Sequence, residues 1–301
     1  MDAAATGAAP EAHRGALRVG PLALTLPAVI GLALVFVAPF AVFVAYSLLT
    51  PDLFDVGTPW TAESYRRVFE TDVNRTLAWN SLVIGLLAAA ISVAVALPIA
   101  YWLRYSAGRL RLLVLFLIVG SMFASYLVRI YAWRSILGTN GLLNSGLQSL
   151  GLIDEPIGVL LYSRFAVVVA LVHIFLPYVV LVLYAGFGPV PASLIECAQD
   201  LGANAAQRWR RVILPVIAAP AASAFLFVFV LCAADYVTPQ FLGGTSGGML
   251  SVQIQANFIT TGNWALGAAT AVVMLVAFVL AYVLVAVGLR LLRLNALRFT
   301  G

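Results

Sequence analysis

The sequence contains no lysine: all 17 basic side chains among its 301 residues are arginines. A P-loop needs a lysine that reaches the nucleotide phosphates, so this chain cannot hydrolyse a nucleotide through a P-loop of its own. The same absence excludes a Schiff-base lysine and a lysine general base. Any ATP-driven process that involves this chain must therefore take its energy from another chain.

Groups that could hold a metal ion or act as a nucleophile are also scarce. The chain has two cysteines, Cys197 and Cys232, and two histidines, His13 and His173. The cysteines lie at opposite ends of one apolar region, where both fit small buried hydrophobic side chains better than a disulfide or a metal pair. We therefore expect no catalytic residue, no metal site and no cofactor.

Charged residues are few, and apolar residues take their place: 10% of the chain is charged and 63% is hydrophobic. That composition lies outside the range of soluble globular domains. Apolar runs of about 18 or more residues indicate transmembrane helices. We place six such runs, at residues 22–49, 77–103, 110–137, 159–188, 212–235 and 264–289. The sequence therefore predicts an all-α integral membrane protein with six transmembrane helices.

The first apolar run is interpreted as a membrane span and not as a cleavable signal peptide. Its apolar core is longer than the roughly 7–15 residues of a signal peptide, and no small-residue cleavage site follows it. Residues 1–20 are small and polar, so we expect a disordered cytoplasmic tail there. Residues 21–301 would then form one transmembrane domain.

The distribution of arginine predicts the orientation in the membrane. With the N-terminus inside, the cytoplasmic segments carry Arg14, Arg18, Arg104, Arg109, Arg111, Arg208, Arg210, Arg211, Arg290, Arg293 and Arg298. The outer loops hold far fewer arginines, and acidic residues partly offset them. The positive-inside rule then places both termini in the cytoplasm, as an even number of spans requires. The basic charge indicates contact with anionic lipid, and no basic stripe interleaved with aromatics suggests nucleic-acid binding.

Three connecting segments are expected to have structure of their own. A short helix is expected in residues 50–76, starting near Thr61, and another in residues 138–158. Residues 236–263 contain no charged side chain in 28 positions. Irregular backbone at membrane depth is tolerated only where protein or water covers it, so we expect this segment to dip into the interface or to fold over the bundle.

One polar segment interrupts the apolar pattern between the fourth and fifth runs. Residues 193–215 read SLIECAQDLGANAAQRWRRVILP. Ser193 and Glu196 have the spacing of a capping box, which predicts a helix that opens at Ser193. Gly202 is expected to end that helix after two turns. A polar helix–turn–helix at a membrane surface fits either a docking element for a partner or an ordinary cytosolic loop.

This segment resembles the EAA loop of ABC importer permeases, which reads EAA, three residues, G, nine residues and I-x-L-P. The spacing in this chain is the same, and Cys197 replaces the alanine at the second position. The positions that carry the resemblance are Glu196, Cys197, Ala198, Asp200, Gly202, Leu214 and Pro215. In that family the loop forms a coupling helix that seats in a groove of an ATPase subunit. The resemblance therefore implies that residues 189–215 dock on an ATPase.

Three further stretches resemble the spermidine/putrescine-type permeases of this family, and the likeness extends over roughly residues 20–295. They are LVRIYAW with NGLLN (127–133 and 140–144), HIFLP (173–177) and DYVTPQFLGG (235–244). The resemblance implies a type I ABC importer permease fold in the bacterial inner membrane, with both termini cytoplasmic.

The resemblance also implies partners and a cargo. The partners would be a dimer of ATPase subunits, an extracytoplasmic solute-binding protein and a second permease, which we expect to be a different chain. ATP-driven closure of the ATPase dimer would rotate the helix bundle and alternate its access. The implied cargo is a polyamine such as spermidine or putrescine. An opine, an amino-acid derivative or ferric iron stays open, because selectivity in such systems rests largely on the binding protein.

Charged residues inside membrane spans are costly and are therefore functional candidates. Asp235 ends the fifth apolar run, and Tyr236 follows it. With Tyr131 and Trp133 from the third run, these residues could line the outer vestibule. They would attract a cation through the carboxylate and through cation–π contacts.

Other interpretations of these residues stay open. Asp235 could instead pair with Arg129 or Arg134, which would neutralise a costly charge, or reach water. The bundle offers few acidic groups to a polycation, so a carboxylate-bearing or zwitterionic solute that meets Arg129 suits the residues equally well. His173 lies one turn before Pro177 and is expected to be a neutral hydrogen-bonding group and not a proton relay.

Two other functional classes fit less well. Residues 244–248, GTSGG, satisfy the G-x-S-x-G pattern of a nucleophilic serine, as in a six-span intramembrane serine protease. Such a serine needs a base, which those proteases take from a later span, and no histidine follows Ser246. A glycine-rich turn explains the pattern better. A stand-alone channel or secondary carrier is the other class, but secondary carriers usually show inverted repeats, and none is evident.

Overall fold

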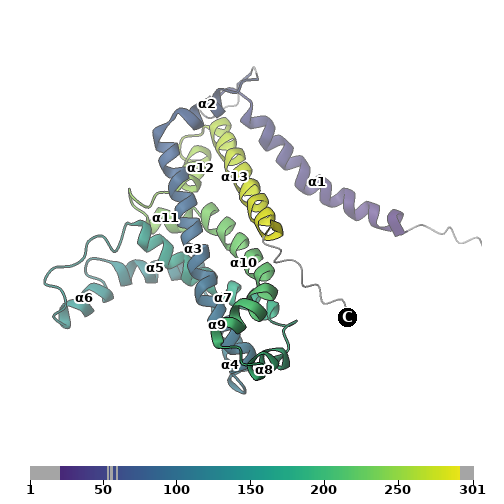
Figure 1. Cartoon of the computed structure of the whole chain (residues 1–301). Helices are drawn as coiled ribbons and strands as arrows, with labels where there is room; N and C mark the ends of the chain where they lie inside the picture. The colour runs from purple at the N-terminus through teal and green to yellow at the C-terminus, as the bar shows by residue number, and fades with distance from the viewer. Residues whose placement is uncertain (1–20, 53, 55–56, 59, 292–301) are drawn as a thin grey trace, which may run out of the picture. The chain divides into compact units, whose positions relative to one another are not determined.

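The computed structural model describes residues 21–52, 54, 57–58 and 60–291, and the regular secondary structure of those residues is helical apart from one isolated bridge between Thr50 and Gly57 (Figure 1). The predicted N-terminal tail, residues 1–20, lies outside the described residues. The chain divides into two units, residues 1–45 and 46–301, and each is described by itself. The predicted all-α fold class is confirmed.

The helices follow one another without any strand between them in the described part of the chain. They are α1 (Pro21–Ser47), α2 (Glu63–Glu70), α3 (Asp72–Tyr105), α4 (Leu110–Met122), α5 (Tyr126–Leu137), α6 (Leu142–Ser149), α7 (Arg164–Gly186), α8 (Ala192–Asp200), α9 (Ala205–Arg208), the π-turn η1 (Trp209–Ile213), α10 (Leu214–Ala234), α11 (Val237–Leu242), α12 (Leu250–Ile259) and α13 (Trp264–Leu291). The short helices predicted near Thr61 and within residues 138–158 correspond to α2 and α6.

Five helical segments are long and apolar enough to cross a membrane: α1, α3, α7, α9 with α10, and α13. The third predicted run, residues 110–137, is corrected by the structure. It forms two helices, α4 and α5, separated by a short break, and the direction of the chain changes by 94° between α4 and the segment Tyr126–Ser149, which contains α5 and α6. The pair counts as a sixth span only if the broken segment is taken as one crossing.

The break between α4 and α5 has a local cause that does not involve proline. The Ser121 hydroxyl donates to the Ile118 carbonyl at 2.6 Å, and such local bonds compete with the helical pattern. Ser125 then leaves the helical region, with ψ at 136°, and α5 starts after it. Most of the surrounding residues are apolar, so the mean hydropathy stays high across the break and does not reveal it.

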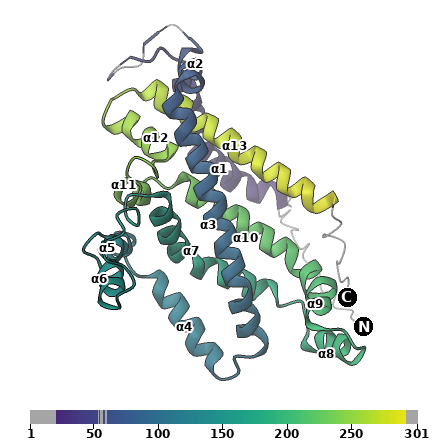
Figure 2. The same cartoon turned by 60° about the vertical axis from the view of Figure 1, so that its left-hand side comes forward.

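The core lies where α3, α7 and α10 pack on one another (Figure 2). Small residues make the close approach possible, because Ala88, Ser92 and Ala96 on α3 are all fully buried. Gly85 continues this stripe: a Cβ there would lie 3.0 Å from the Cβ of Ala233 on α10. Small residues on this helix therefore allow α3 to pack closely on its neighbours.

The unit of residues 46–301 has two ends, which we name by the helices found there. At the α2 end, α2 and the start of α13 lie beside the first turns of α3 (Figures 1 and 2). At the α8 end, α8 and α9 lie near the turn that joins α3 to α4. The ion pairs formed by the described residues all belong to the α2 end: Arg66–Glu70, Arg67–Glu63 and Arg75–Asp72.

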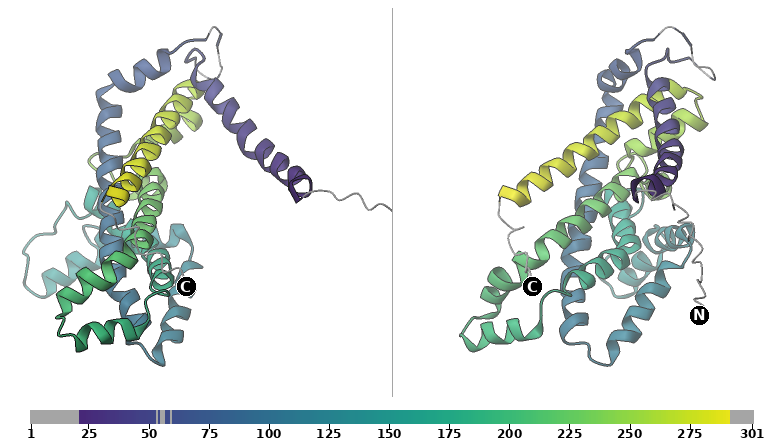
Figure 3. Two further views of the ribbon diagram at one scale, coloured as in Figure 1. Left: turned by 45° about the vertical axis from the view of Figure 1, so that its right-hand side comes forward. Right: turned by 90° about the vertical axis from the view of Figure 1, so that its right-hand side faces the viewer.

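The segment between α10 and α13 folds back over the bundle, as one of the two sequence alternatives predicted. It forms α11, a glycine-rich turn and α12, and it is bonded to α3 and to the start of α7. The helix that follows, α13, packs on α2 and α12 at its start (Figure 3). Most of its later described side chains are exposed.

Candidate functional site

The helix α8 begins at a proline and not at the predicted capping box. Pro191 is its N-cap residue, and no side chain caps the helix start. The residue before a proline is disfavoured in the helical region, so the helix opens directly after Pro191 and Ser193 falls inside its first turn. The predicted capping box of Ser193 and Glu196 is therefore wrong.

A capping box does occur eleven residues later, at the start of α9. The Gln207 amide donates to Asn204 Oδ1 and the Asn204 amide donates to Gln207 Oε1, both at 2.9 Å. This reciprocal pair satisfies two of the free amides at a helix start. The returning arm of the loop is thus a structured element and not an irregular tail.

Gly202 ends α8 as predicted. Its φ is +81°, in the left-handed region that favours glycine. Its amide donates to the Gln199 carbonyl at 2.9 Å, and the Ala203 amide donates to the Ala198 carbonyl at 3.0 Å, so the turn closes on the last helical carbonyls. The space around the Gly202 α-carbon is open, because no atom lies within 4 Å of a Cβ built there.

The helix α8 is uncovered. None of its nine residues, all of them described, is buried, and Leu201 at its end is 82% exposed. Arg208 Nη1 donates to Gln199 Oε1 at 2.6 Å, which braces α8 against α9. The loop is thus held in shape by its own bonds while its outer surface is left free.

The same exposure corrects one cysteine prediction. Cys232 on α10 is a free, fully buried thiol, as expected, whereas Cys197 is a free and exposed thiol on α8. The expectation of a buried side chain is wrong for Cys197 because α8 stands away from the bundle, where no neighbouring helix covers it.

The two last residues of the EAA pattern mark the return of the chain into the bundle. Pro215 cannot donate to the Arg211 carbonyl, and in a regular helix its ring would crowd that carbonyl. The π-turn of residues 209–213 widens the helix just before the proline, and the Leu214 amide donates to the Trp209 carbonyl across it. Leu214 and Pro215 then begin α10.

Asp235, the first predicted pathway residue, caps a short helix. Its two carboxylate oxygens accept from the amides of Val237 and Thr238, each at 3.1 Å, at the start of α11. Its backbone carbonyl accepts from the Ser251 hydroxyl at 2.6 Å. Asp235 is not among the ion-paired residues of the described chain, so the alternative of a pair with Arg129 or Arg134 is not supported.

Arg129 is bonded to the backbone at the break between α4 and α5. Its Nη2 donates to the carbonyls of Met122 and Ala124 at 3.3 and 2.6 Å, and its Nη1 donates to the Ile174 carbonyl of α7 at 3.4 Å. Carbonyls at a helix end lack intrahelical partners. The guanidinium therefore satisfies the carbonyls freed by the break and ties them to α7.

The two aromatic candidates of α5 lie against different helices. The Tyr131 ring centroid lies 5.4 Å from that of Phe241 on α11. The Trp133 ring meets His173 of α7 edge-on, with the centroids 5.8 Å apart. Trp133 and His173 are therefore partners in helix packing, and the five predicted pathway residues do not share one cavity.

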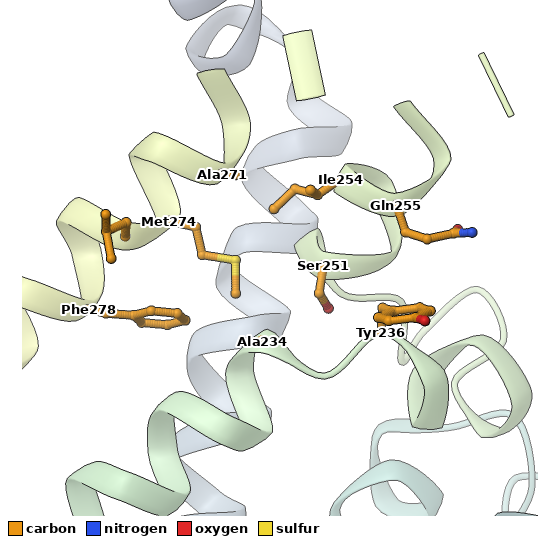
Figure 4. A pocket seen from close by; sticks show the side chains of 9 residues that line it. Ala234, Tyr236, Ser251, Ile254, Gln255, Ala271, Met274 and Phe278 are labelled. Atoms are coloured by element: carbon orange, nitrogen blue, oxygen red, sulfur yellow. The ribbon is translucent and has the colours of Figure 1, made fainter. Parts of the chain in front are cut away.

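A cavity of about 430 Å³ lies between the end of α10, α12 and α13 (Figure 4). Tyr236 is the predicted pathway residue that lines it. Ser251 and Gln255 lie on the same side as Tyr236, and Met274 and Phe278 lie opposite. Sequence reasoning missed Ser251 and Gln255, because uncharged polar residues in a loop give no distinctive pattern.

Ser246 belongs to the glycine-rich turn between α11 and α12. Its hydroxyl donates to the Tyr162 carbonyl at 3.3 Å, and its own carbonyl accepts from Asn80 Nδ2 and Arg164 Nε at 3.2 and 3.1 Å. Gly244 has a φ of +54° in this turn. The glycine-rich turn predicted for this pattern is confirmed.

Comparison with known proteins adds family information to this geometry. Residues 92–293 match the family described as binding-protein-dependent transport system inner membrane component. The chain is 32% identical over 235 residues to the spermidine/putrescine transport system permease protein PotB of Haemophilus influenzae, which covers 78% of this chain and 82% of the relative. It is 30% identical over 246 residues to the PotB protein of Escherichia coli, covering 81% and 89%.

More distant similarity extends to a sugar system and to solved structures. The chain is 28% identical over 230 residues to the trehalose transport system permease protein SugB of Mycobacterium tuberculosis, covering 74% of this chain and 77% of the relative. Its fold is similar to that of a chain from a bacterial ABC transporter involved in the import of alginate. That match has a TM-score of 0.72 and 15% sequence identity, and it covers 93% of this chain and 95% of the other.

Proposed function

This chain belongs to the family of binding-protein-dependent transport system inner membrane components, and we propose that it is the permease subunit of a polyamine-type ABC importer. Family membership confirms the resemblance stated from the sequence, the inner-membrane location and the class of a non-enzymatic transporter subunit. The intramembrane protease and the stand-alone carrier are not favoured.

The uncovered helix α8 carries the proposal. Its exposed residues include Glu196, Cys197 and Asp200, and Gly202 turns the chain back directly after them. Ala198, another residue of the EAA pattern, is half-buried. A polar helix with no buried residue and with this exposed polar side is suited to a groove on another chain. This protein lacks the lysine of a P-loop and its loop resembles the EAA loop, so the partner chain would be the ATPase subunit.

The α8 end would face the cytoplasm, together with both termini. Six arginines belong to this end: Arg104, Arg109, Arg111, Arg208, Arg210 and Arg211. The acidic groups of the α2 end are already paired with arginines there. This distribution supports the orientation that the positive-inside rule predicts.

The translocation pathway would pass the 430 Å³ cavity. The ring of Tyr236 offers a cation–π surface, Ser251 and Gln255 offer neutral oxygen acceptors, and Met274 and Phe278 offer apolar surface to a methylene chain. Asp235 lies next to Tyr236 and supplies negative charge near this site.

The three remaining pathway candidates would shape the walls of the pathway. Arg129 holds the break between α4 and α5, whereas Tyr131 and Trp133 set the contacts of α5 with α11 and α7. Each would act on the position of a helix and not by binding the solute directly.

The complete importer would contain a second permease, which we propose to be a different chain, two ATPase subunits and an extracytoplasmic binding protein. One similar structure is that of a bacterial alginate ABC transporter in complex with an alginate pentasaccharide-bound periplasmic protein, with a TM-score of 0.69 and 16% sequence identity. That assembly supports the expectation of a binding protein for this chain.

Uptake in proteoliposomes tests the proposal. The chain would be reconstituted with the second permease, the ATPase and the binding protein of the same importer. Labelled spermidine or putrescine would be supplied outside the vesicles and ATP inside them. We expect ATP-dependent accumulation that excess unlabelled polyamine abolishes. Accumulation of neither polyamine, while another solute is imported, would contradict the substrate class.

The docking role is tested by reversing one charge on α8. Glu196→Lys is expected to abolish ATP-driven uptake while the chain still inserts in the membrane. Glu70→Lys is the matched control, because Glu70 is also exposed but lies at the α2 end, in a surface ion pair that contributes little. Normal uptake by the Glu196 variant would count against docking through α8.

A further inference from the structure

Four aromatic rings join the loop of residues 189–215 to the last turn of α3. We name Tyr101, Tyr105, Phe187 and Trp209 the aromatic clamp. The ring centroid of Tyr101 lies 5.0 Å from that of Tyr105, 6.1 Å from Phe187 and 5.3 Å from Trp209, and the Tyr105 and Phe187 centroids are 6.0 Å apart. Aromatic pairs at these separations attract beyond simple burial.

The clamp contacts both arms of the loop. Phe187 is fully buried at the end of α7, where the entering arm begins. Trp209 opens the π-turn of the returning arm, and π-turns occur frequently at functional sites. A movement of the returning arm would therefore act on Tyr101 through Trp209, and Tyr101 also contacts Phe187 at the end of α7, just before the entering arm.

Hydrogen bonds strengthen the link on the entering arm. The Tyr105 hydroxyl donates to the Val190 carbonyl at 2.9 Å, and Arg104 Nη2 donates to the Gly188 carbonyl at 3.4 Å. The helix α8 itself is separated from α3 by a cavity of about 210 Å³, which Ile195 and Glu196 help to line. The helix α3 thus holds the two arms and leaves α8 free for a partner.

The first third of α3 is hydrogen-bonded to the α11–α12 segment, which lines one side of the 430 Å³ cavity. Asn80 Nδ2 donates to the carbonyls of Ser246 and Gly248 at 3.2 and 2.9 Å, and the Leu250 amide donates to Ser81 Oγ at 2.8 Å. Asn80 is 1% exposed. These bonds fix the start of α12, the helix that carries two of the polar groups in the cavity.

One unbroken helix connects the two attachments. Twenty residues separate Ser81 from Tyr101, which corresponds to about 30 Å of α-helix. Most of the path is packed tightly on α7 and α10 through the buried stripe of small residues. Coupling between distant sites is carried by contiguous packed elements of this kind.

We infer that α3 transmits movement of the 189–215 loop to the α11–α12 segment. The aromatic clamp links α3 to the loop, and the hydrogen bonds of Asn80 and Ser81 link α3 to that segment. The inference rests on the proposed docking of this loop on an ATPase. Tyr101 and Asn80 are positioning residues in this scheme. Tyr101 transmits the displacement at one end of the helix, and Asn80 passes it to the backbone of the cavity at the other.

The first test measures solute imported per ATP hydrolysed in the reconstituted importer. Tyr101→Leu is expected to keep ATPase binding and hydrolysis but to lower this ratio about tenfold, the effect of losing ring contacts of this kind. Tyr101→Phe keeps the ring and is expected to retain the normal ratio. Trp102→Leu, on an exposed neighbour of the same helical turn, is the control for the loss of a ring alone.

The second test combines both ends of α3. Asn80→Leu leaves the clamp intact and is expected to lower the ratio as Tyr101→Leu does. If α3 carries one signal, the double variant is no worse than either single variant. Losses that multiply in the double variant would mean two independent effects and would overturn the inference.

A third measurement does not depend on the solute. Nitroxide labels at Leu152 and Ile259, both strongly exposed, would be attached through unnatural amino acids, so that the exposed thiol of Cys197 stays unmodified. We expect ATP binding to change the distance between the labels, and Tyr101→Leu to abolish this change. A full change in the Tyr101→Leu complex would overturn the inference.

The outcomes separate this inference from the proposed function. A complex that imports no polyamine but shows the ATP-driven distance change, lost in Tyr101→Leu, would refute the substrate class and support α3 as the transmitting helix. A wild-type chain that binds no ATPase would refute the proposed function. It would also remove the source of the loop movement that α3 is inferred to transmit.

Discussion

Substitutions at Gly202 separate two requirements for docking on the ATPase. One is the left-handed backbone conformation of the turn, and the other is the space that the ATPase groove leaves for a side chain. In the isolated chain the only constraint on this residue is its backbone, with φ at +81° and open space where a Cβ would be. A side chain in the left-handed region costs about 1–2 kcal/mol for most residues. Asparagine tolerates this region much better than alanine or valine does.

The magnitude follows from this cost. An energy of about 1–2 kcal/mol lowers the population of the correctly turned loop roughly 5- to 30-fold relative to other conformations. Gly202→Ala is therefore expected to weaken ATPase binding by up to that factor, Gly202→Val to weaken it further, and Gly202→Asn to weaken it least. Binding of the purified ATPase to the permease in nanodiscs and ATP-driven uptake measure the series.

The order of the series is the decisive result. If Gly202→Asn and Gly202→Ala lose binding equally, the backbone conformation is not what matters, and the ATPase groove itself excludes a side chain. If all three variants bind and transport normally, the turn at Gly202 has no part in docking, and the reasoning is refuted. Membrane insertion of each variant, checked by its yield, is the control.

Two further predictions concern residues whose bonds the structure defines. Arg129→Met leaves two carbonyls at the α4–α5 break and the Ile174 carbonyl of α7 without this donor, so a loss of about 1–3 kcal/mol per unsatisfied buried group is expected, measured as a lower melting temperature in detergent. Arg129→Lys should lose less, and equal melting of all three proteins would contradict the capping role. Asp235→Asn keeps an oxygen for the α11 amides but removes the charge. Reduced polyamine uptake with unchanged melting would assign Asp235 an electrostatic role, and unchanged uptake would limit it to capping; we expect the reduction.

The membrane fold was largely predictable from the sequence, because apolar runs report directly on bilayer thickness. All six runs lie on apolar helices, and the turn at Gly202 was predicted from a residue type with one strong conformational preference. The break at residues 123–125 was not predictable in the same way. Its carbonyls are satisfied by Arg129, and a bond from a guanidinium one helical turn later leaves no mark in a hydropathy pattern.

The coupling loop and the pathway differ in how far the sequence predicted them. The spacing of the 189–215 loop identified its residues, but the helix start was misplaced because the proline before it outweighed the Ser193 motif. Asp235 was singled out for its charge, whereas its bonds to α11 depend on a helix only six residues long. Ser251 and Gln255 were missed because their importance comes from α12 folding back against α10 and α13.

The chemistry of the cavity bears on where a polyamine importer would obtain its affinity. The acidic groups of the α2 end, Glu63, Glu70 and Asp72, are each paired with an arginine, and both oxygens of Asp235 already accept amide hydrogens. The described lining of the cavity contains no carboxylate, so a polycation would meet rings and neutral oxygens there, with the charge of Asp235 beside them. Weak contacts of this kind suit a pathway, since a solute that binds tightly in transit cannot leave. Tight capture would then fall to the binding protein, and the permease would contribute passage and its control by α3.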